Sequence, residues 1–248
     1  MNDSNGLPLQ FEGVGLTYPD GTEALRGVSL SIAPGEFVSV VGSSGCGKST
    51  LLKLASGLIQ PTDGRVVVDR ARLGYVFQDA TLAPWRTVQK NVELLPELHH
   101  IDKAERRRIA CEAIDMVGLS GFEQHYPKSL SGGMKMRVSL ARSLTLDPNV
   151  FLFDEPFSAL DEITRERLNA ELAALFKSQG FAGLFITHNI FEAAYLSTRV
   201  LVMSKRPGRI VAEVEVPFSY PRDEGLRFQP EFADVGDRIS KALRETHE

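Results

Sequence analysis

Short apolar runs alternate with longer amphipathic stretches along most of the chain. Residues 37–41 and 150–153 are almost wholly apolar, and each run leads into a stretch with helical spacing, at 49–58 and 161–177. Near-continuous apolar strands followed by helices are typical of a parallel sheet that is covered on both faces. The pattern therefore predicts an α/β fold with a mostly parallel sheet and flanking helices.

A central region departs from this alternation. Between residues 79 and 148, apolar side chains recur three and four positions apart, most clearly in 102–117 and 133–146. This spacing places them on one face of a helix. We therefore expect a helical insert within the α/β core.

The C-terminal part of the chain also departs from the alternation of apolar strands and helices. The apolar runs 200–203 and 210–216 flank the turn dipeptide Pro207-Gly208, which indicates a hairpin, and a last helix is expected over about 231–245. We interpret the whole chain, 1–248, as one domain. Its expected parts are a core at 1–78 and 149–216, a helical insert at 79–148 and a C-terminal extension at 217–248.

Composition narrows the class of protein. With 43% hydrophobic residues in a chain of 248, a sizeable core can be buried, which argues against disorder. The 28 Lys and Arg against 32 Asp and Glu give a net charge of −4, so no global positive field would attract nucleic acid. Cys46 and Cys111 are too few for a disulfide framework. The first ten residues lack the pattern of an export signal, and no apolar run approaches the roughly 18 residues of a membrane span, so a soluble, cytoplasmic protein is expected.

One glycine-rich segment has the pattern of a phosphate-binding loop. It matches GxxxxGK[ST] between an apolar strand and a helix, with the residues Gly42, Ser43, Ser44, Gly45, Cys46, Gly47, Lys48 and Ser49, followed by Thr50. Glycines let successive backbone N–H groups point at an anion, and the N-terminus of the helix adds partial positive charge. Lys48 is expected to reach the β- and γ-phosphates, and Ser49 to ligate Mg²⁺. A glycine-rich turn that binds nothing is the alternative.

Two adjacent carboxylates follow the apolar run 150–153. Asp154 and Glu155 at the end of a buried strand are costly unless a cation or a proton-transfer role offsets their burial. We expect Asp154 to hold Mg²⁺ and Glu155 to be the general base for an attacking water. His188 follows another apolar run and is expected at the same carboxyl edge of the sheet, close to the γ-phosphate or the water. A purely structural histidine is the alternative.

A second glycine motif narrows the family. Leu130-Ser131-Gly132-Gly133 stands before a helix that Ser131 can cap, which makes a second backbone anion site. With this motif the sequence resembles the ATP-binding-cassette (ABC) ATPases, whose LSGGQ signature is uncommon elsewhere, over roughly residues 9–216. The resemblance implies a P-loop NTPase core with an N-terminal antiparallel β part, and ATP and Mg²⁺ as ligands. It also implies a head-to-tail homodimer in which each signature closes over ATP held by the other copy.

Further residues match motifs of that family one by one. The resemblance implies that Tyr18 stacks on adenine and that Gln78 senses Mg²⁺ and the γ-phosphate. It implies that Asp161 lies in the loop that crosses to the partner copy, and that His188 is the switch histidine. These matches occur in family order along the chain.

Two positions depart from the family pattern. Met134 stands where the signature has glutamine, which keeps the backbone contacts of Ser131, Gly132 and Gly133 but removes a polar side chain. Asn189 follows the histidine where the family has aspartate, which removes a charge near the site.

Two softer patterns, at 82–88 and 203–210, resemble importer ATPases for nitrate, sulfonate, taurine and related solutes. In such importers the segment after the Q-loop receives a helix of the membrane subunit, so the region from Gln78 to Trp85 is expected to contact integral membrane permease subunits. A core tryptophan is the alternative for Trp85. The resemblance further implies a separate solute-binding protein and a peripheral place at the cytoplasmic face of the membrane. The run 188–193 instead resembles the branch that imports pyrimidine or thiamine precursors, so the solute stays open.

Two other functions stay open at this level. A soluble ABC protein that acts on ribosomes or DNA commonly carries two cassettes or a long coiled-coil insertion, and this chain has room for neither. A P-loop kinase for a small molecule would leave the signature and Asp161 unexplained. The sequence therefore favours an importer ATPase without a nucleic-acid partner.

Overall fold

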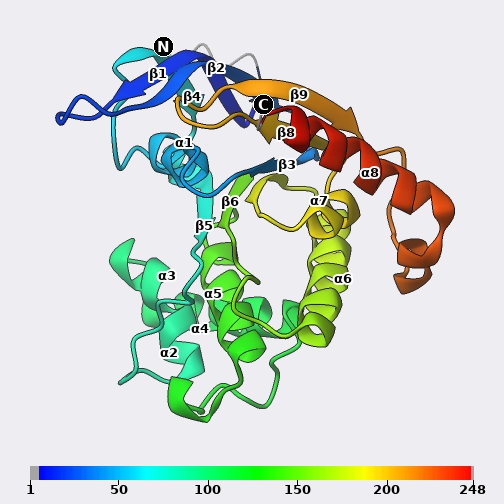
Figure 1. The fold of residues 1–248 in the computed structure, drawn as a ribbon. Helices are drawn as coiled ribbons and strands as arrows, with labels where there is room; N and C mark the ends of the chain where they lie inside the picture. The colour runs from blue at the N-terminus through cyan, green and yellow to red at the C-terminus, as the bar shows by residue number, and fades with distance from the viewer. Residues whose placement is uncertain (1–5, 247–248) are drawn as a thin grey trace.

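Two sheets lie in the upper part of the molecule and a group of helices in the lower part (Figure 1). The computed structural model describes residues 6–246. Residues 1–5 and 247–248 lie outside the described residues. The first group belongs to the N-terminal stretch that lacks the pattern of an export signal, and the second to the expected C-terminal extension. Among the described residues, no helix combines the length and the apolar character needed to cross a membrane.

The larger sheet has six strands in the order β5-β6-β7-β3-β8-β9. Its strands are β3 (Phe37–Gly42), β5 (Leu73–Val76), β6 (Val150–Asp154), β7 (Ala182–Ile186), β8 (Arg199–Met203) and β9 (Ile210–Glu215). All neighbouring pairs are parallel except β8 and β9, which are antiparallel. The predicted α/β class, with its mostly parallel sheet, is confirmed, and so is the hairpin at Pro207-Gly208.

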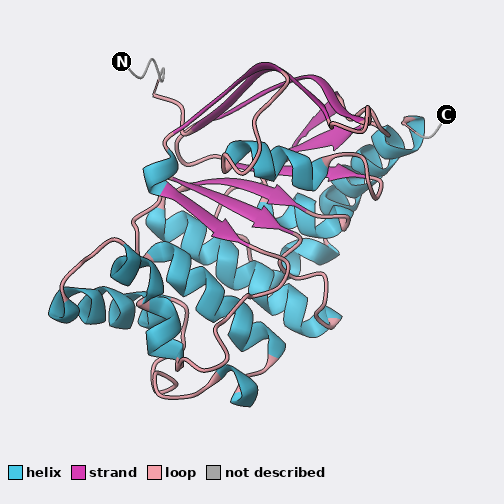
Figure 2. Ribbon diagram, turned by 90° about the vertical axis from the view of Figure 1, so that its left-hand side faces the viewer, coloured by secondary structure: helices cyan, strands magenta, loops and turns pink. Residues whose placement is uncertain are grey.

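The smaller sheet is antiparallel, with the order β2-β1-β4. It comprises β1 (Leu9–Thr17), β2 (Glu23–Ile32) and β4 (Asp63–Val68). Helix α1 (Lys48–Ala55) lies between the two sheets (Figure 2), and Leu51 and Leu52 share a buried apolar cluster with Phe11 of β1 and Val38 of β3. The antiparallel part that the resemblance implied is therefore present and covers the helix of the phosphate loop.

Helices cover the other face of the larger sheet and continue below it (Figures 1 and 2). The helices after α1 are α2 (Val88–Val92), α3 (Leu94–Leu98), α4 (Lys103–Met116), α5 (Gly132–Leu144), α6 (Glu162–Gln179), α7 (Ile190–Leu196) and α8 (Pro230–Glu245). Three short 3₁₀ turns lie at Arg70–Arg72, Pro127–Ser129 and Glu224–Phe228. The last helix occupies the expected residues and buries Phe232, Val235 and Ile239.

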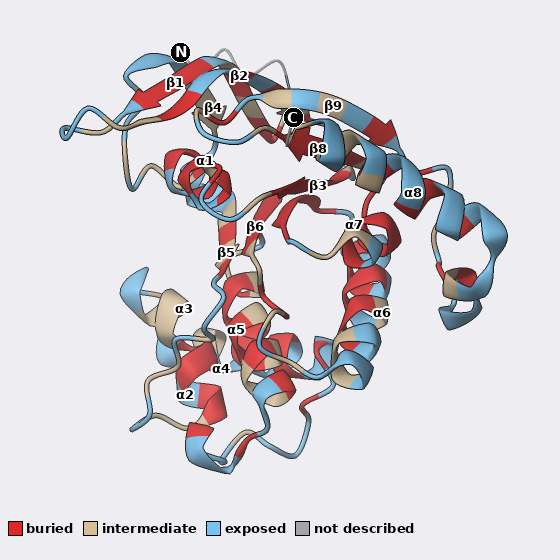
Figure 3. Ribbon diagram, in the orientation of Figure 1, coloured by how far each residue is buried: buried red, intermediate tan, exposed pale blue. Residues whose placement is uncertain are grey.

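Side-chain burial follows the layers of the fold (Figure 3). One apolar cluster lies between the larger sheet and α6, α7 and α8, and includes Phe37, Phe151 and Phe185. A separate cluster holds α2, α4 and α5 together through residues such as Val92, Ile114 and Val138. In α4 the buried residues Ala110, Ala113 and Ile114 lie on one face, as the spacing of 102–117 predicted.

Two strand glycines allow phenylalanine rings to lie flat against the sheet. A Cβ atom on Gly183 of β7 would lie 2.6 Å from Cδ2 of Phe37, and one on Gly74 of β5 would lie 2.6 Å from Cδ1 of Phe151. Both rings are fully buried, so neither has space to retreat. Close approach of the ring, rather than backbone freedom, explains these glycines.

Gly183→Ala is expected to lower the free energy of unfolding by about 1–3 kcal/mol, because the added methyl group overpacks the site against Phe37. Urea denaturation of both proteins measures the difference. Combining the change with Phe37→Leu should cost less than the sum of the two single changes, because the smaller side chain leaves space for the methyl group. Additive costs would contradict the steric explanation.

Candidate active site

Three adjacent strands of the larger sheet deliver the predicted catalytic residues to one edge. The strand order β6-β7-β3 is parallel, so their carboxyl ends lie side by side. The phosphate loop follows β3, Glu155 follows β6, and His188 comes two residues after β7. This is the edge at which open α/β sheets bind ligands.

A cavity of about 320 Å³ opens at this edge. Its volume is within the range of small-molecule sites. Nine of its lining residues were predicted as site residues, and Ala24 and Arg206 were not; the full lining is Tyr18, Ala24, Ser44, Gly45, Gly47, Lys48, Ser49, Thr50, Glu155, His188 and Arg206. A larger cavity of about 560 Å³ between α4, α5 and α6 is lined mainly by apolar side chains and contains none of the predicted catalytic residues.

The phosphate loop has the backbone conformation that its glycines predicted. Gly45 and Gly47 have φ angles of 73° and 112°, which an L side chain rarely adopts. The amide groups of Ser44, Gly45 and Gly47 donate to no acceptor among residues 6–246. The buried ammonium of Lys48 donates to the carbonyl oxygens of Gly42 and Ser43, at 2.8 and 3.0 Å. The loop therefore offers free N–H groups and one cation to an anion.

Cys46 belongs to the loop but does not line the cavity. Its side chain is buried beneath the loop, and burial raises the pKa of its thiol. A Cβ atom on Gly42 would lie 2.8 Å from Sγ of Cys46, so the first glycine of the motif makes room for this side chain. Gly42 and Cys46 therefore affect the site through the shape of the loop.

Ser49 and Asp154 meet although they are far apart in the sequence. The Ser49 hydroxyl donates to Oδ1 of Asp154 at 3.1 Å. Burial raises the pKa of the Asp154 carboxyl, and the neighbouring charge of Glu155 raises it further. A hydroxyl and a carboxylate are hard oxygen ligands of the kind that Mg²⁺ takes, and a cation would relieve the cost of burying this carboxylate. The two residues therefore fit the expected metal.

Glu155 and His188 form a direct pair. Nδ1 of His188 lies 2.8 Å from Oε2 of Glu155. Glu155 has a φ angle of 43°, which is uncommon for a residue other than glycine. Its backbone is held by its N–H, which donates to Ile186 O at 3.0 Å, and by its carbonyl, which accepts from the Ser158 hydroxyl at 2.9 Å. The conformation of Glu155 is thus fixed by neighbouring backbone rather than by its own preference.

Gln78 does not line the cavity in this chain. It is exposed, and its side-chain amide donates to the Ser158 hydroxyl at 3.3 Å. Since Ser158 also holds the carbonyl of Glu155, Gln78 is two hydrogen bonds away from the predicted general base. Sequence patterns did not indicate the link through Ser158.

Tyr18 lines the cavity, and its stacking on adenine stays a prediction. Its hydroxyl shares a hydrogen bond with the Thr50 hydroxyl at 3.3 Å. This bond connects the tyrosine to the start of α1.

The signature residues lie outside this cavity. Ser131 caps α5 by accepting a hydrogen bond from the Met134 amide at 3.2 Å, and Asp161 caps α6 by accepting from the Thr164 amide at 3.0 Å. A Cβ atom on Gly133 would lie 3.2 Å from Cγ2 of Thr164, so this glycine allows α5 to approach α6 closely. Gly132 is exposed at the start of α5.

The two departures from the family pattern have local explanations. The Met134 side chain is partly buried and packs against the apolar cluster of α2, α4 and α5. Asn189 caps α7 by accepting hydrogen bonds from the amides of Phe191 and Glu192, at 2.9 and 3.1 Å. An uncharged asparagine therefore serves as an N-cap as well as the aspartate would.

Arg206 is the main site residue that the sequence reasoning missed. It lies in the turn between β8 and β9, and its guanidinium donates to the carbonyl of Gly45 at 3.0 Å. The turn reaches the phosphate loop because the amide of Gly208 donates to Ala24 O at 2.9 Å. This pairing with the other sheet helps to place Arg206 at the cavity, and the family pattern at 203–210 gave no sign of it.

Trp85 is 77% exposed. The alternative of a core tryptophan is therefore wrong. The side chain stands on the segment between β5 and α2, which also carries Gln78.

The comparisons with known proteins identify the family. A family model described as ABC transporter matches residues 25–158. The nitrate import ATP-binding protein NrtD of Synechocystis sp. is 43% identical, over 91% of this chain and 90% of that protein. The taurine import ATP-binding protein TauB of Yersinia pestis is 41% identical, over 96% of this chain and 98% of that protein. This chain belongs to the ABC transporter family and is an ATPase of that family.

Solved structures agree with this result. The cbiO1 protein of Clostridium perfringens, described as part of the ABC transporter complex cbiONQ, superposes with a TM-score of 0.80 at 25% identity. It covers 95% of this chain and 100% of its own. The dimeric cassette MJ0796 bound to ADP and Pi has a TM-score of 0.73 at 33% identity, over 85% of this chain and 100% of its own. The resemblance seen in the sequence is confirmed.

Arg206→Ala is expected to weaken ATP binding about three- to tenfold, because it removes one of the two cations that line the cavity. Equilibrium titration with a fluorescent ATP analogue measures the dissociation constant. Arg209→Ala, in the same turn but outside the cavity, is the matched control and should bind as the wild type does. Equal effects of the two changes would show that Arg206 acts only through overall charge.

Asp154→Asn is expected to raise the melting temperature of the metal-free protein by a few degrees at pH 7, because it removes a buried carboxylate next to Glu155. A carboxyl whose pKa is raised by folding costs stability when it is ionised, so the difference from wild type should shrink as the pH falls toward the unfolded value of about 3.9. Thermal melts in EDTA between pH 4 and 8 test this. A variant that melts below wild type at pH 7 would contradict it.

Proposed function

We propose that this chain is the ATP-hydrolysing subunit of an importer for a small solute. The cavity that joins the phosphate loop, Glu155 and His188 is the observation that carries the proposal. The relatives named for nitrate and taurine import support it. The candidate solutes are nitrate, taurine, another sulfonate, or a pyrimidine or thiamine precursor, and we assign their recognition to a separate solute-binding protein and the membrane subunits.

ATP binding is assigned to the phosphate loop and Tyr18. The free amides of residues 44, 45 and 47 donate to phosphate oxygens, and the N-terminus of α1 adds partial positive charge. The Lys48 ammonium, which now donates to two loop carbonyls, turns to the β- and γ-phosphates. The Tyr18 ring stacks on adenine at the outer end of the cavity.

Hydrolysis is assigned to Glu155 with His188. Glu155 accepts a proton from the attacking water, and neighbouring backbone fixes the conformation of this residue at the edge of the cavity. His188 is within 2.8 Å of that carboxylate and orients it, and its exposed ring is free to contact the γ-phosphate. Lys48 stabilises the charge that develops on the transferred phosphoryl group.

Mg²⁺ is assigned to Ser49 and Asp154, with Gln78 as a third contact when nucleotide is present. When bound, the ion would supply positive charge that offsets the negative charge of the phosphate groups. The Ser49 hydroxyl and the Asp154 carboxylate, 3.1 Å apart, offer oxygen ligands beside the phosphate loop. Gln78 now donates a hydrogen bond to the neutral Ser158 hydroxyl. It can give up this bond for a contact with the bound Mg²⁺.

A head-to-tail homodimer is proposed for the ATP-bound state. The signature residues Ser131, Gly132, Gly133 and Met134, and Asp161, lie outside this chain's own cavity. Ser131 and Gly132 are exposed at the N-terminus of α5, so their backbone groups can contact phosphates held by a second copy. ATP then bridges the two copies, and its hydrolysis removes the bridge. The dimeric form of MJ0796 supports this arrangement.

The segment from Gln78 to Trp85 is proposed to contact integral membrane permease subunits. An exposed tryptophan is an effective anchor at a protein interface. With this contact the chain acts as a peripheral protein at the cytoplasmic face of the membrane. The cbiO1 structure, part of a transporter complex, supports such an assembly.

The division of the domain follows from the same proposal. Core segments 1–78 and 149–216 carry nucleotide chemistry, and the insert 79–148 carries the signature and, from residue 79 on, the segment proposed to contact the permease. The extension 217–248 covers the core through α8. Neither a role on ribosomes or DNA nor a kinase reaction is favoured, since the matched relatives are import ATP-binding proteins over most of the chain.

Glu155→Gln is expected to lower phosphate release from MgATP by roughly 100-fold or more while ATP binding is kept, because the amide cannot accept the proton of the water. The trapped ATP should hold two copies together. Phosphate release and light scattering after size-exclusion chromatography measure the two effects. Glu112→Gln, an exposed carboxylate on α4, is the control.

The outcome separates the candidate functions. ATP-dependent dimers in Glu155→Gln without hydrolysis support the proposal. A variant that hydrolyses ATP normally would contradict the role of Glu155, and a wild type that phosphorylates a metabolite in place of water would contradict the proposed function.

A further inference from the structure

The segment that carries Trp85 is held at two points by buried side chains from two different helices. Asn91 of α2 is fully buried and Arg142 of α5 is 7% exposed. Both direct their polar groups at backbone atoms of residues 80–87, which we call the Trp85 loop. The proposed function uses the loop but assigns nothing to either side chain.

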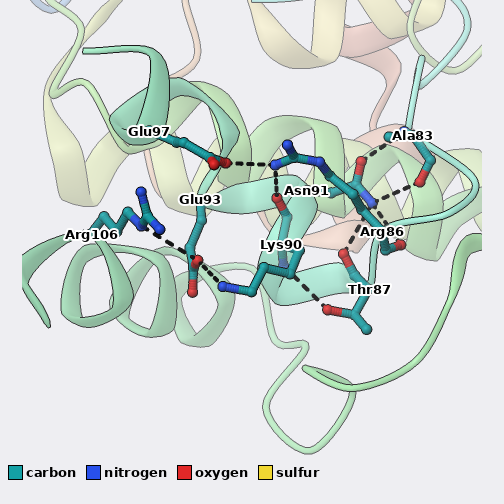
Figure 4. A network of polar contacts seen from close by, with 8 residues as sticks. All are labelled: Ala83, Arg86, Thr87, Lys90, Asn91, Glu93, Glu97 and Arg106. Atoms are coloured by element: carbon teal, nitrogen blue, oxygen red, sulfur yellow. Dashed lines mark hydrogen bonds and ion pairs between the residues drawn. The ribbon is translucent and has the colours of Figure 1, made fainter. Parts of the chain in front are cut away.

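Asn91 holds the second half of the Trp85 loop (Figure 4). Its Oδ1 accepts from the Ala83 amide at 2.8 Å. Its Nδ2 donates to the carbonyl oxygens of Ala83, Arg86 and Thr87, at 3.2, 3.0 and 3.0 Å. One buried amide thus satisfies backbone groups on both sides of Trp85, and the indole is left pointing outward.

Arg142 holds the first half of the loop. Its guanidinium donates to Thr81 O at 3.0 Å, to the Thr81 hydroxyl at 3.1 Å and to Ala80 O at 3.2 Å. Thr81 has a φ angle of 46°, an uncommon conformation that these bonds help to fix. Among the described residues the partners of Arg142 are carbonyl and hydroxyl oxygens and no carboxylate pairs with it, and burial lowers its pKa. A buried cation that bonds only to neutral oxygens is costly, so its role is in what it positions.

The two anchors connect the loop to the helix that begins at the signature. Arg142 lies on α5, which starts just after Ser131. Asn91 lies on α2, which packs against α5 through the shared apolar cluster of Val88, Val92 and Val138. A further bond, from the Ser143 hydroxyl to Tyr75 O at 2.9 Å, attaches α5 to the strand that leads into the loop.

We propose that Asn91 and Arg142 are positioning residues that make the Trp85 loop one rigid unit with the signature helix α5. A displacement of α5, when its N-terminus engages nucleotide, is then carried to Trp85 and to the membrane subunit that we propose it contacts. The inference rests on the proposed function for the identity of that partner, but the mechanical link is a property of this chain alone.

Trp85 is the sole tryptophan of the chain, so its fluorescence reports on the loop without labelling. Asn91→Ala is expected to lower the steady-state anisotropy of Trp85 by about a third, because the freed loop moves on the nanosecond timescale. Arg142→Lys, which keeps the charge but cannot span three acceptors, should act in the same direction. Both proteins should bind ATP with an unchanged dissociation constant.

Matched controls lie on the same two helices. Gln89→Ala on α2 removes a buried amide that bonds to Glu93, and Arg137→Lys on α5 alters a guanidinium that pairs with Glu171. Neither side chain contacts the Trp85 loop, so both variants should keep the wild-type anisotropy. Thermal melts of all four variants identify any that fails to fold. If Asn91→Ala fails to fold, the result with Arg142→Lys decides the test.

The coupling is read from the emission of Trp85 on addition of MgATP. In the wild type the emission should change, and in Asn91→Ala and Arg142→Lys the change should fall by about half or more. Unchanged anisotropy in the folded variants, or a wild type whose Trp85 does not respond to MgATP, would overturn the proposal. Phosphate release is measured in parallel. ATP hydrolysis without a Trp85 response contradicts only the proposed connection between α5 and the Trp85 loop, whereas the absence of ATP hydrolysis contradicts the proposed function.

Discussion

The chemistry of this ATPase depends on the adjacency of three parallel strands. β6, β7 and β3 are neighbours in the larger sheet, and each ends at the same edge. Residues that are more than 100 positions apart, such as Ser49 and Asp154, therefore meet within 3.1 Å. Strands β3, β6 and β7 are buried on both faces, so the relative positions of the proposed catalytic groups do not depend on flexible connections. Any change in strand register would separate them.

Several motif residues also stabilise the fold locally. Ser131, Asp161 and Asn189 cap α5, α6 and α7 through their side chains. Each cap satisfies backbone N–H groups that would otherwise have no partner, at a typical value of about 1 kcal/mol. These positions thus have a structural reason to keep a short polar side chain before nucleotide is considered. A cap also fixes where the helix starts, and so where its remaining free N–H groups point.

The sequence predicted the elements that depend on local pattern. The alternation of apolar runs and helices, the hairpin of β8 and β9, and the last helix all follow from short-range periodicity and turn residues, and all are present. The meeting of Ser49 with Asp154 and of Glu155 with His188 at one sheet edge was expected from the motifs, but other contacts between distant segments were not predicted. Arg206 reaches the cavity because its turn pairs with Ala24, and Arg142 reaches Thr81 across 61 positions. Such contacts depend on how elements pack in three dimensions, for which periodicity gives no signal.

The conformation of Glu155 has a consequence for how the site can vary. Its φ of 43° costs about 1 kcal/mol for a residue with a Cβ atom, and the hydrogen bonds from its own N–H to Ile186 and from Ser158 to its carbonyl offset that cost. The direction of the carboxylate is therefore set by the main chain, which two neighbours hold, more than by side-chain rotation. Moving the carboxylate to an adjacent position would not preserve that direction. The proposed general base and its backbone therefore form a single unit, whose chemistry a substitution can alter but whose position along the chain cannot shift.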